Sequence, residues 1–137
     1  MSGPLAGVTV VDLSRILAGP YCTLLMAELG ARVIKVETPK TGDDARAYGP
    51  FLKGKSAYFM SVNRGKESIA LNLKDKGDRA IFEKLLETAD VIVENFRPGT
   101  MEKLGYGWEQ LHAKYPKLIY AAASGDRKST RLNSSHR

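Results

Sequence analysis

The stretch DVIVENFRPG, residues 90–99, decides the fold class of this chain. It begins with an apolar run that is typical of a strand buried on both faces, and Pro98 and Gly99 end it with turn residues. In open α/β sheets, ligands bind beyond the carboxyl ends of the strands. Asn95, Phe96 and Arg97 follow such an end, so they are candidates for holding an anionic ligand that carries a ring.

Toward the N-terminus, residues 8–37 are predicted to form a strand, a helix and a second strand. Residues 8–13 are β-branched and apolar, and residues 14–19 form the loop that follows. Pro20 fits the first turn of a helix over residues 21–29, which Gly30 ends, and residues 32–37 form the next strand. A right-handed crossover is the default for this unit.

The remaining chain continues the alternation of strands and helices. Residues 38–55 are rich in Gly, Pro and charge, which predicts a long surface loop with at most one helical turn. Residues 57–62 and 68–73 are predicted as short strands around a turn, as in a hairpin or bent ladder. A helix over 75–89, a strand over 90–93, helices over 100–104 and 108–114, and a strand over 118–123 follow. The pattern predicts an α/β fold with a mostly parallel, doubly wound sheet and flanking helices.

Composition excludes several classes of protein. The chain has 137 residues, 43% of them hydrophobic, which is enough for the core of one domain, and no apolar run is long enough to span a membrane. A secretory signal is not visible and Cys22 is the single cysteine, so we expect a cytoplasmic protein without disulfides. No cluster of His, Cys, Asp or Glu has metal-ligand spacing, so we expect no metal.

The net charge of +6 depends on the C-terminal residues. Residues 126–137 hold four basic residues and one acid, and without them 17 basic residues face 14 acidic ones. This modest balance argues against a nucleic-acid ligand. The segment DRKSTRLNSSHR is polar, and its residues 126–136 match an in-frame translation of a common sequencing adapter. We therefore expect residues 126–137 to be an artefactual, disordered tail on a gene cut at Gly125, and a natural basic tail is the alternative.

Three loops follow strand ends, over residues 14–20, 37–40 and 95–99. In the first, Ala18 and Gly19 allow a ligand to approach the backbone and the amides of the next helix, although an ordinary tight turn has the same pattern. The loop lacks the GxGxxG spacing of a nicotinamide dinucleotide site. Basic residues that can neutralise phosphates, or simply lie in solvent, are Arg15, Arg64, Lys66, Lys74, Arg97 and Lys103.

Other reactive residues fit ordinary structural roles. His112 lies on a predicted helix without an acidic or cysteine partner at a useful spacing. Cys22 lies within an apolar helix and is expected to be a small buried residue. Asp43 and Asp44 are expected to point outward or to cap a helix.

Five stretches in order resemble the N-terminal part of the class III CoA-transferase family, which also contains racemases such as α-methylacyl-CoA racemase. They are PLAGVTVVDLSRILAGPYCTLLMAELGARVIKVE (4–37), GDDAR (42–46), NRGKESIALNLK (63–74), DVIVENFRPGTMEKLGYG (90–107) and LIYAAASG (118–125). The resemblance implies that residues 1–125 are part of a Rossmann-like large domain. It also implies a second, smaller domain and an interlocked homodimer in the full-length protein.

The resemblance further implies that CoA, as free CoA or acyl-CoA, lies along these loops. Ile16 and Ala18 resemble backbone contacts, Leu71 and Lys74 lie beside the nucleotide, and Asn95 and Phe96 line the pantetheine and adenine region. Arg97 and Lys103 resemble cations that face the phosphates, and Arg64 and Lys66 are weaker matches. Leu17 replaces a Gln found in some oxalate-using members, so the motifs favour succinyl-CoA or another dicarboxylyl-CoA over formyl-CoA and oxalate.

Transferases of this family use an Asp nucleophile to move CoA from an acyl-CoA to a free carboxylic acid. That Asp lies downstream of LIYAAASG, so the resemblance assigns no catalytic residue to this chain and implies that it is inactive alone. Two alternatives stay open. One is a fragment of a racemase of the same family, and the other is a non-catalytic nucleotide-binding or basic interaction module.

Overall fold

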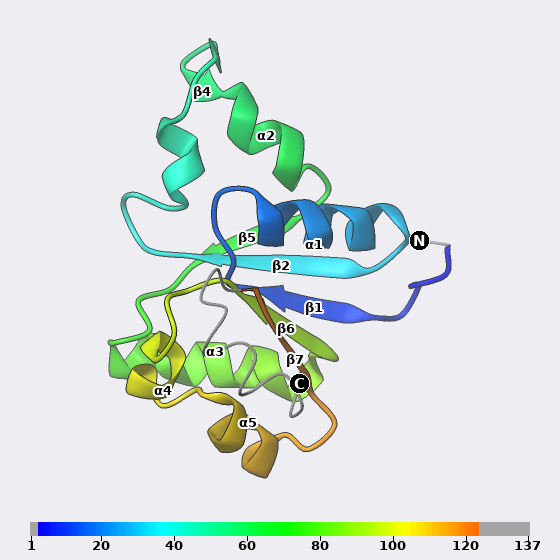
Figure 1. Ribbon diagram of the computed structural model, residues 1–137, viewed down its shortest axis with the longest axis vertical. Coiled ribbons are helices and arrows are strands. Elements are labelled where there is room, and N and C mark those ends of the chain that lie inside the picture. Colours follow the sequence, from blue (N-terminus) through cyan, green and yellow to red (C-terminus); the bar gives the residue numbers. More distant parts are fainter. Residues whose placement is uncertain (1–2, 124–137) are drawn as a thin grey trace.

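A five-stranded parallel sheet forms the centre of the molecule. The computed structural model describes residues 3–123. The sheet contains β1 (Thr9–Asp12), β2 (Arg32–Glu37), β5 (Glu67–Ala70), β6 (Val91–Glu94) and β7 (Ile119–Ala122). The strand order is β5-β2-β1-β6-β7 and every neighbouring pair is parallel, as Figure 1 shows. The predicted α/β class with a parallel sheet is confirmed.

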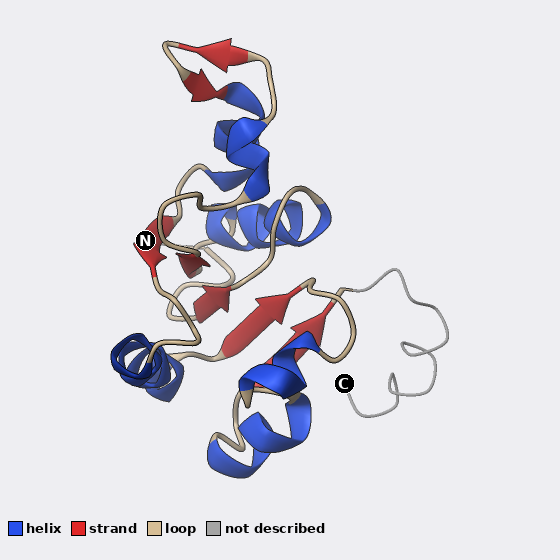
Figure 2. Cartoon of the chain, turned by 90° about the vertical axis from the view of Figure 1, so that its left-hand side faces the viewer, coloured by secondary structure: helices blue, strands red, loops and turns tan. Residues whose placement is uncertain are grey.

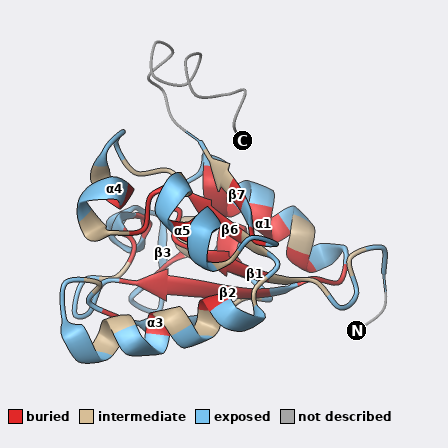
Figure 3. Cartoon of the chain, turned by 90° about the horizontal axis from the view of Figure 1, so that it is seen from below, coloured by how far each residue is buried: buried red, intermediate tan, exposed pale blue. Residues whose placement is uncertain are grey.

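Helices cover both faces of this sheet. Helix α1 (Ala18–Glu28) lies on one face, and α3 (Lys76–Thr88), α4 (Thr100–Leu104) and α5 (Trp108–Lys114) lie on the other (Figure 1). Neighbouring residues of β1 point to opposite faces, so Val10 packs with Ala27 of α1 while Val11 packs with Phe82 of α3. Figure 3 shows the strands buried between exposed outer faces of the helices. The sheet is therefore doubly wound.

One predicted strand is wrong. Residues predicted as a strand over 57–62 form helix α2 (Ala57–Asn63), although Tyr58, Phe59 and Val62 favour strands. The Ser56 side chain caps this helix by accepting the Phe59 N–H at 3.0 Å, and the Arg46 guanidinium lies 3.9 Å from the centre of the Phe59 ring. These contacts outweigh strand propensity. The second predicted strand exists as β5, but it pairs in parallel with β2, so the predicted hairpin is also wrong.

The region predicted as a long loop contains regular structure. It holds the short 3-10 helix η1 (Asp44–Ala47), which confirms the helical turn, and an antiparallel hairpin of β3 (Phe51–Leu52) and β4 (Lys55–Ser56). This hairpin and α2 project away from the sheet in Figure 2. The predicted tail at 126–137 lies outside the described residues.

Cys22 does not have the buried position predicted for it. It is exposed on α1, because the residues of this helix that face the sheet are Thr23, Leu24 and Ala27. Its neighbour Tyr21 is 52% exposed. Within residues 3–123, no helix combines the length and the apolar character needed to cross a membrane.

Candidate ligand site at the switch point of the sheet

The strand order reverses at β1, which places a crevice between two loops. The chain runs from β1 toward β2 on one side, and it later returns to β6 on the other side. The loops that follow β1 and β6 therefore diverge from the carboxyl ends of these two strands. Open α/β sheets bind ligands at such a place. Two of the three predicted loops meet at this switch point.

Asn95 joins these two loops. Its side-chain Oδ1 accepts the Arg15 N–H at 2.9 Å, and its Nδ2 donates to the Arg15 carbonyl at 2.8 Å. This double contact spans 80 residues of sequence. Asn95 thus holds the backbone of the loop after β1 in place.

Ile16 and Ala18 lie in the loop after β1 but do not line the cavity described below. Ile16 adopts a left-handed backbone with φ of 73°, and its N–H donates to the Asp43 carboxylate at 3.1 Å. Ala18 is exposed as the first residue of α1. Gly19 is buried, and a Cβ there would lie 2.2 Å from the Ser14 Cβ. The absence of a side chain at Gly19 is therefore required by packing on Ser14, as in the tight turn that the sequence also allowed.

Buried ion pairs support this loop from below. The Lys35 Nζ lies 2.8 Å from the Asp43 Oδ2, and it also donates to the Ser14 carbonyl at 2.8 Å. Asp43 caps η1 by accepting the Ala45 N–H, which confirms the predicted capping role, but it is buried. The loop after β1 is thus fixed by a charged group that the sequence did not single out, Lys35.

A second buried pair joins Lys66 to Asp12, with 3.3 Å between Nζ and Oδ2. Asp12 also accepts hydrogen bonds from Ser14 and from the Thr23 hydroxyl. Burial lowers the pKa of Lys66 to about 8, although the charge of Asp12 acts in the opposite direction. The Lys66 amine is thus bound within this buried network. Arg64 pairs with Glu28 on the surface. Neither of these weaker candidates lines the cavity.

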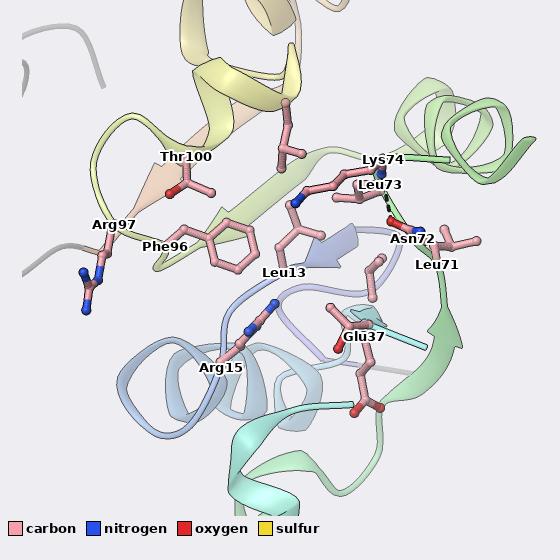
Figure 4. A pocket seen from close by; sticks show the side chains of 13 residues that line it. Leu13, Arg15, Glu37, Leu71, Asn72, Leu73, Lys74, Phe96, Arg97 and Thr100 are labelled. Carbon is pink, nitrogen blue, oxygen red and sulfur yellow. Dashed lines mark hydrogen bonds between the residues drawn. The ribbon is translucent and has the colours of Figure 1, made fainter. Parts of the chain in front are cut away.

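A cavity of about 410 Å³ lies beside the switch point. Five of the predicted residues line it, namely Arg15, Leu71, Lys74, Phe96 and Arg97. Figure 4 shows Phe96 and Arg15 directed toward the same space, while the Arg97 guanidinium lies at the edge and points outward. The Arg15 guanidinium carbon is 5.2 Å from the centre of the Phe96 ring. Leu13, Val36 and Leu104 add apolar wall.

Lys103 lines a neighbouring cavity of about 480 Å³. This second cavity shares Leu73, Lys74, Thr100 and Leu104 with the first, so the two lie side by side. Lys74, Arg97 and Lys103 form no ion pair within residues 3–123. Uncompensated cations around an apolar-walled space favour an anionic ligand with an apolar part.

Glu37 is the acidic residue in the wall of the first cavity. Burial by itself would raise its pKa, but hydrogen bonds from Arg46, from Ser68 and from the Asp43 N–H outweigh burial and lower the pKa to about 2. Glu37 is therefore ionised at neutral pH and held by Arg46 at 2.8 Å. Arg46, Ser68 and the Asp43 N–H therefore bind the Glu37 carboxylate within the protein.

Sequence reasoning missed Arg79, Thr100 and Leu104 as lining residues. Arg79 belongs to α3 and reaches the cavity only because α4 packs beside that helix, which no local pattern reveals. Thr100 and Leu104 sit within the motif that includes Lys103, so the helical spacing after ENFRPG was the available signal. Among residues 3–123 no three metal-ligating side chains cluster.

A parallel sheet of this order, flanked by helices and with an apolar and cationic cavity beside its switch point, defines a Rossmann-like fold. The sequence pattern of CoA-transferase family III matches residues 5–129. The chain belongs to this family.

Relatives agree with this assignment. The chain is 55% identical over 123 residues to acetyl-CoA:oxalate CoA-transferase of Acetobacter aceti, covering 90% of this chain and 32% of that protein. It is 46% identical over 123 residues to human succinyl-CoA:glutarate CoA-transferase, covering 89% of this chain and 28% of that protein. The chain thus spans about a third of the length of such relatives.

Solved structures give the same result. A CAIB/BAIF family protein from Brucella suis superposes with a TM-score of 0.82 at 43% identity, over 89% of this chain and 33% of that one. A protein from Mycobacterium tuberculosis has a TM-score of 0.82 at 43% identity, over 90% of this chain and 35% of that one. The described fold is therefore that of one part of these larger proteins.

Proposed function

We propose that this chain is the N-terminal, CoA-binding part of an acyl-CoA:carboxylate CoA-transferase. The observation that carries the proposal is the pair of adjacent cavities beside the switch point, which combine an apolar wall with lysines that form no ion pair within residues 3–123. CoA has matching chemistry, since it carries an adenine ring, three phosphate groups and a pantetheine arm. The named activities of the relatives, with oxalate and glutarate as acids, support the same reaction class.

Each predicted site residue receives a role in this proposal. Phe96 and Leu71 offer apolar contact to the adenine or pantetheine, and Lys74, Lys103 and Arg97 neutralise phosphates. Ile16 and Ala18 lie outside both cavities, so in this proposal their backbone contacts a part of CoA that extends beyond the cavities to the loop after β1. Asn95 keeps that loop in place, because both ends of its amide bond the Arg15 backbone.

The acyl transfer itself needs a carboxylate nucleophile. An Asp oxygen attacks the thioester carbonyl and expels the CoA thiolate, and that thiolate then attacks the resulting anhydride at the aspartyl carbonyl and releases the first acid. The acceptor carboxylate next attacks the aspartyl thioester, which expels the CoA thiolate and forms a second anhydride. The thiolate then attacks the acceptor's acyl carbonyl in this anhydride, which forms the new acyl-CoA and releases the Asp carboxylate.

No aspartate of residues 3–123 fits this role. Asp12 and Asp43 are buried in ion pairs, and Asp75 caps α3. Asp78 accepts the Asn72 N–H, and Asp90 accepts the Thr9 N–H. Asp44 is exposed in the first turn of η1, outside both cavities. We therefore expect the 137-residue chain alone to catalyse no CoA exchange.

Further parts of the proposal concern the full-length protein. We infer that residues 1–125 belong to its large domain, that a smaller domain completes the site, and that two copies interlock as a cytoplasmic homodimer. Its substrates are an acyl-CoA, for which succinyl-CoA or another dicarboxylyl-CoA is the first candidate, and a free carboxylic acid.

Isothermal titration of the 137-residue chain with CoA tests the proposal. We expect measurable binding that weakens at least fivefold in Lys103→Met. Lys84→Met is the matched control, because it removes one exposed positive charge from α3 without touching either cavity. Equal weakening in both variants, or no binding by the unmodified chain, would overturn the proposal. Exchange between succinyl-CoA and a free acid by this chain would overturn the expected inactivity.

A further inference from the structure

Arg79 connects two wall segments, at Leu73 and Leu104, that the two adjacent cavities share. Its Nη1 donates to the Leu73 carbonyl at 2.9 Å and to the Leu104 carbonyl at 2.6 Å. Leu73 lies in the loop after β5, whereas Leu104 ends α4, so one nitrogen atom ties segments 31 residues apart along the sequence. The contact fixes how far apart the two walls stand.

The guanidinium is itself held in one orientation. It lies over the Tyr106 ring, with 4.4 Å from its carbon to the ring centre. The Tyr106 hydroxyl donates to the Glu83 carboxylate at 2.8 Å, and Tyr106 is buried. A planar cation stacked on an aromatic ring loses less freedom in bonding two carbonyls than a flexible side chain would.

The two carbonyls that Arg79 binds stand next to the unpaired lysines. The Leu73 carbonyl belongs to the peptide bond that leads into Lys74, and Leu104 directly follows Lys103. Both lysines line the same cavity as Arg79. The backbone positions of the two cations therefore depend on one side chain.

We propose that Arg79 is a positioning residue for the ligand site, which sets the spacing of Lys74 and Lys103 so that both meet one phosphorylated ligand. The proposal rests on the proposed function, since it takes CoA as that ligand. Arg79 acts through the backbone at Leu73 and Leu104, because its Nη1 donates to the carbonyls of these two residues. Loss of the Arg79 side chain should therefore weaken CoA binding strongly only in a chain that still carries Lys103.

A double-mutant cycle on CoA affinity, measured with the 137-residue chain at low ionic strength, tests this dependence. We expect Arg79→Met to raise the Kd for CoA at least tenfold in the unmodified chain, but less than threefold in a chain that carries Lys103→Met. Lys84→Met, which removes the same charge from the same helix, should change the Kd less than twofold in both backgrounds. A full tenfold effect of Arg79→Met in the Lys103→Met background would overturn the proposal.

Circular dichroism separates loss of fold from loss of placement. Should Arg79→Met unfold, Arg79→Lys replaces it, because lysine keeps the charge but lacks the planar group that stacks on Tyr106 while bonding two carbonyls. We expect this variant to stay folded and to raise the Kd at least threefold, again only when Lys103 is present. Unchanged affinity in folded Arg79→Lys would overturn the positioning role, whereas absence of CoA binding by the unmodified chain would overturn the proposed function.

Discussion

Replacing Lys35 with methionine should strongly destabilise the domain, because it leaves the Asp43 carboxylate buried without its cation. Both side chains are 1% exposed, and their charged atoms lie 2.8 Å apart. Removing one partner of a buried pair costs about 3–5 kcal/mol. The N–H groups of Ile16 and Ala45 still bond Asp43 in the variant, which places the loss near the lower end, about 3 kcal/mol.

Urea denaturation followed by circular dichroism measures this loss. With a slope of about 2 kcal/mol per molar urea, the midpoint should fall by roughly 1.5 M. Arg32→Met is the control, since Arg32 lies on the same strand and pairs with Glu67 on the surface, where 63% of its side chain is exposed. That variant should leave the midpoint nearly unchanged. The double variant Lys35→Met with Asp43→Asn should recover much of the loss, because no unpaired charge stays buried. Equal midpoints for Lys35→Met and Arg32→Met would refute the reasoning.

Three further predictions concern the groups around the switch point. The pKa of Lys66 is about 8 in the folded chain against 10.5 in the unfolded one, so the unfolded state binds more protons between these values and stability should rise with pH from 8 to 10. Lys66→Met should remove this rise when urea midpoints are measured at each pH. A rise that persists in the variant would show that another group causes the pH dependence. The pKa of Glu37 is about 2 against 4.5, so its contribution is complete above pH 4.5 and disappears as pH falls toward 2. Acid titration of Glu37→Gln should therefore show a shallower loss than the unmodified chain, and identical curves would contradict this. Asn95→Ala removes two hydrogen bonds to the Arg15 backbone and should cost about 1–3 kcal/mol in urea unfolding, while a cost near zero would mean that the loops do not depend on Asn95.

Local patterns predicted most of the sheet. In β1 and β6 consecutive residues are buried on opposite faces, as Val10 and Val11 show, and such unbroken apolar runs identify central parallel strands without any knowledge of partners. The segment that became α2 illustrates the limit. Its residues Tyr58 and Phe59 favour strands. They are helical because Ser56 caps the helix and because Arg46 contacts the Phe59 ring. Arg46 lies more than ten residues before Phe59, so no local pattern reveals this contact.

The candidate site divides in the same way. Leu71 and Lys74 lie within four residues of the end of β5, and Phe96 and Arg97 lie within three residues of the end of β6. The motifs that resemble the family therefore sufficed to single out these four residues, which line one cavity. Arg79 was missed because its role arises from α3 and α4 packing side by side. Cys22 was misplaced because the outer face of α1 also carries apolar residues, which makes its exposed and buried sides alike in sequence.

Nuclear magnetic resonance of the 137-residue chain during titration with CoA tests the central claim most directly. Amide signals of residues 71–74 and 96–104 should shift together with one dissociation constant. Signals of Leu25, on the outer face of α1, and of Leu29, directly after that helix, should stay in place, because these residues lie outside both cavities. Saturable shifts of the cavity residues, with those of Ile16 and Ala18, are the predicted result. Shifts centred on Leu25 and Leu29, or no shift at millimolar CoA, would contradict the assignment of this crevice as the CoA site.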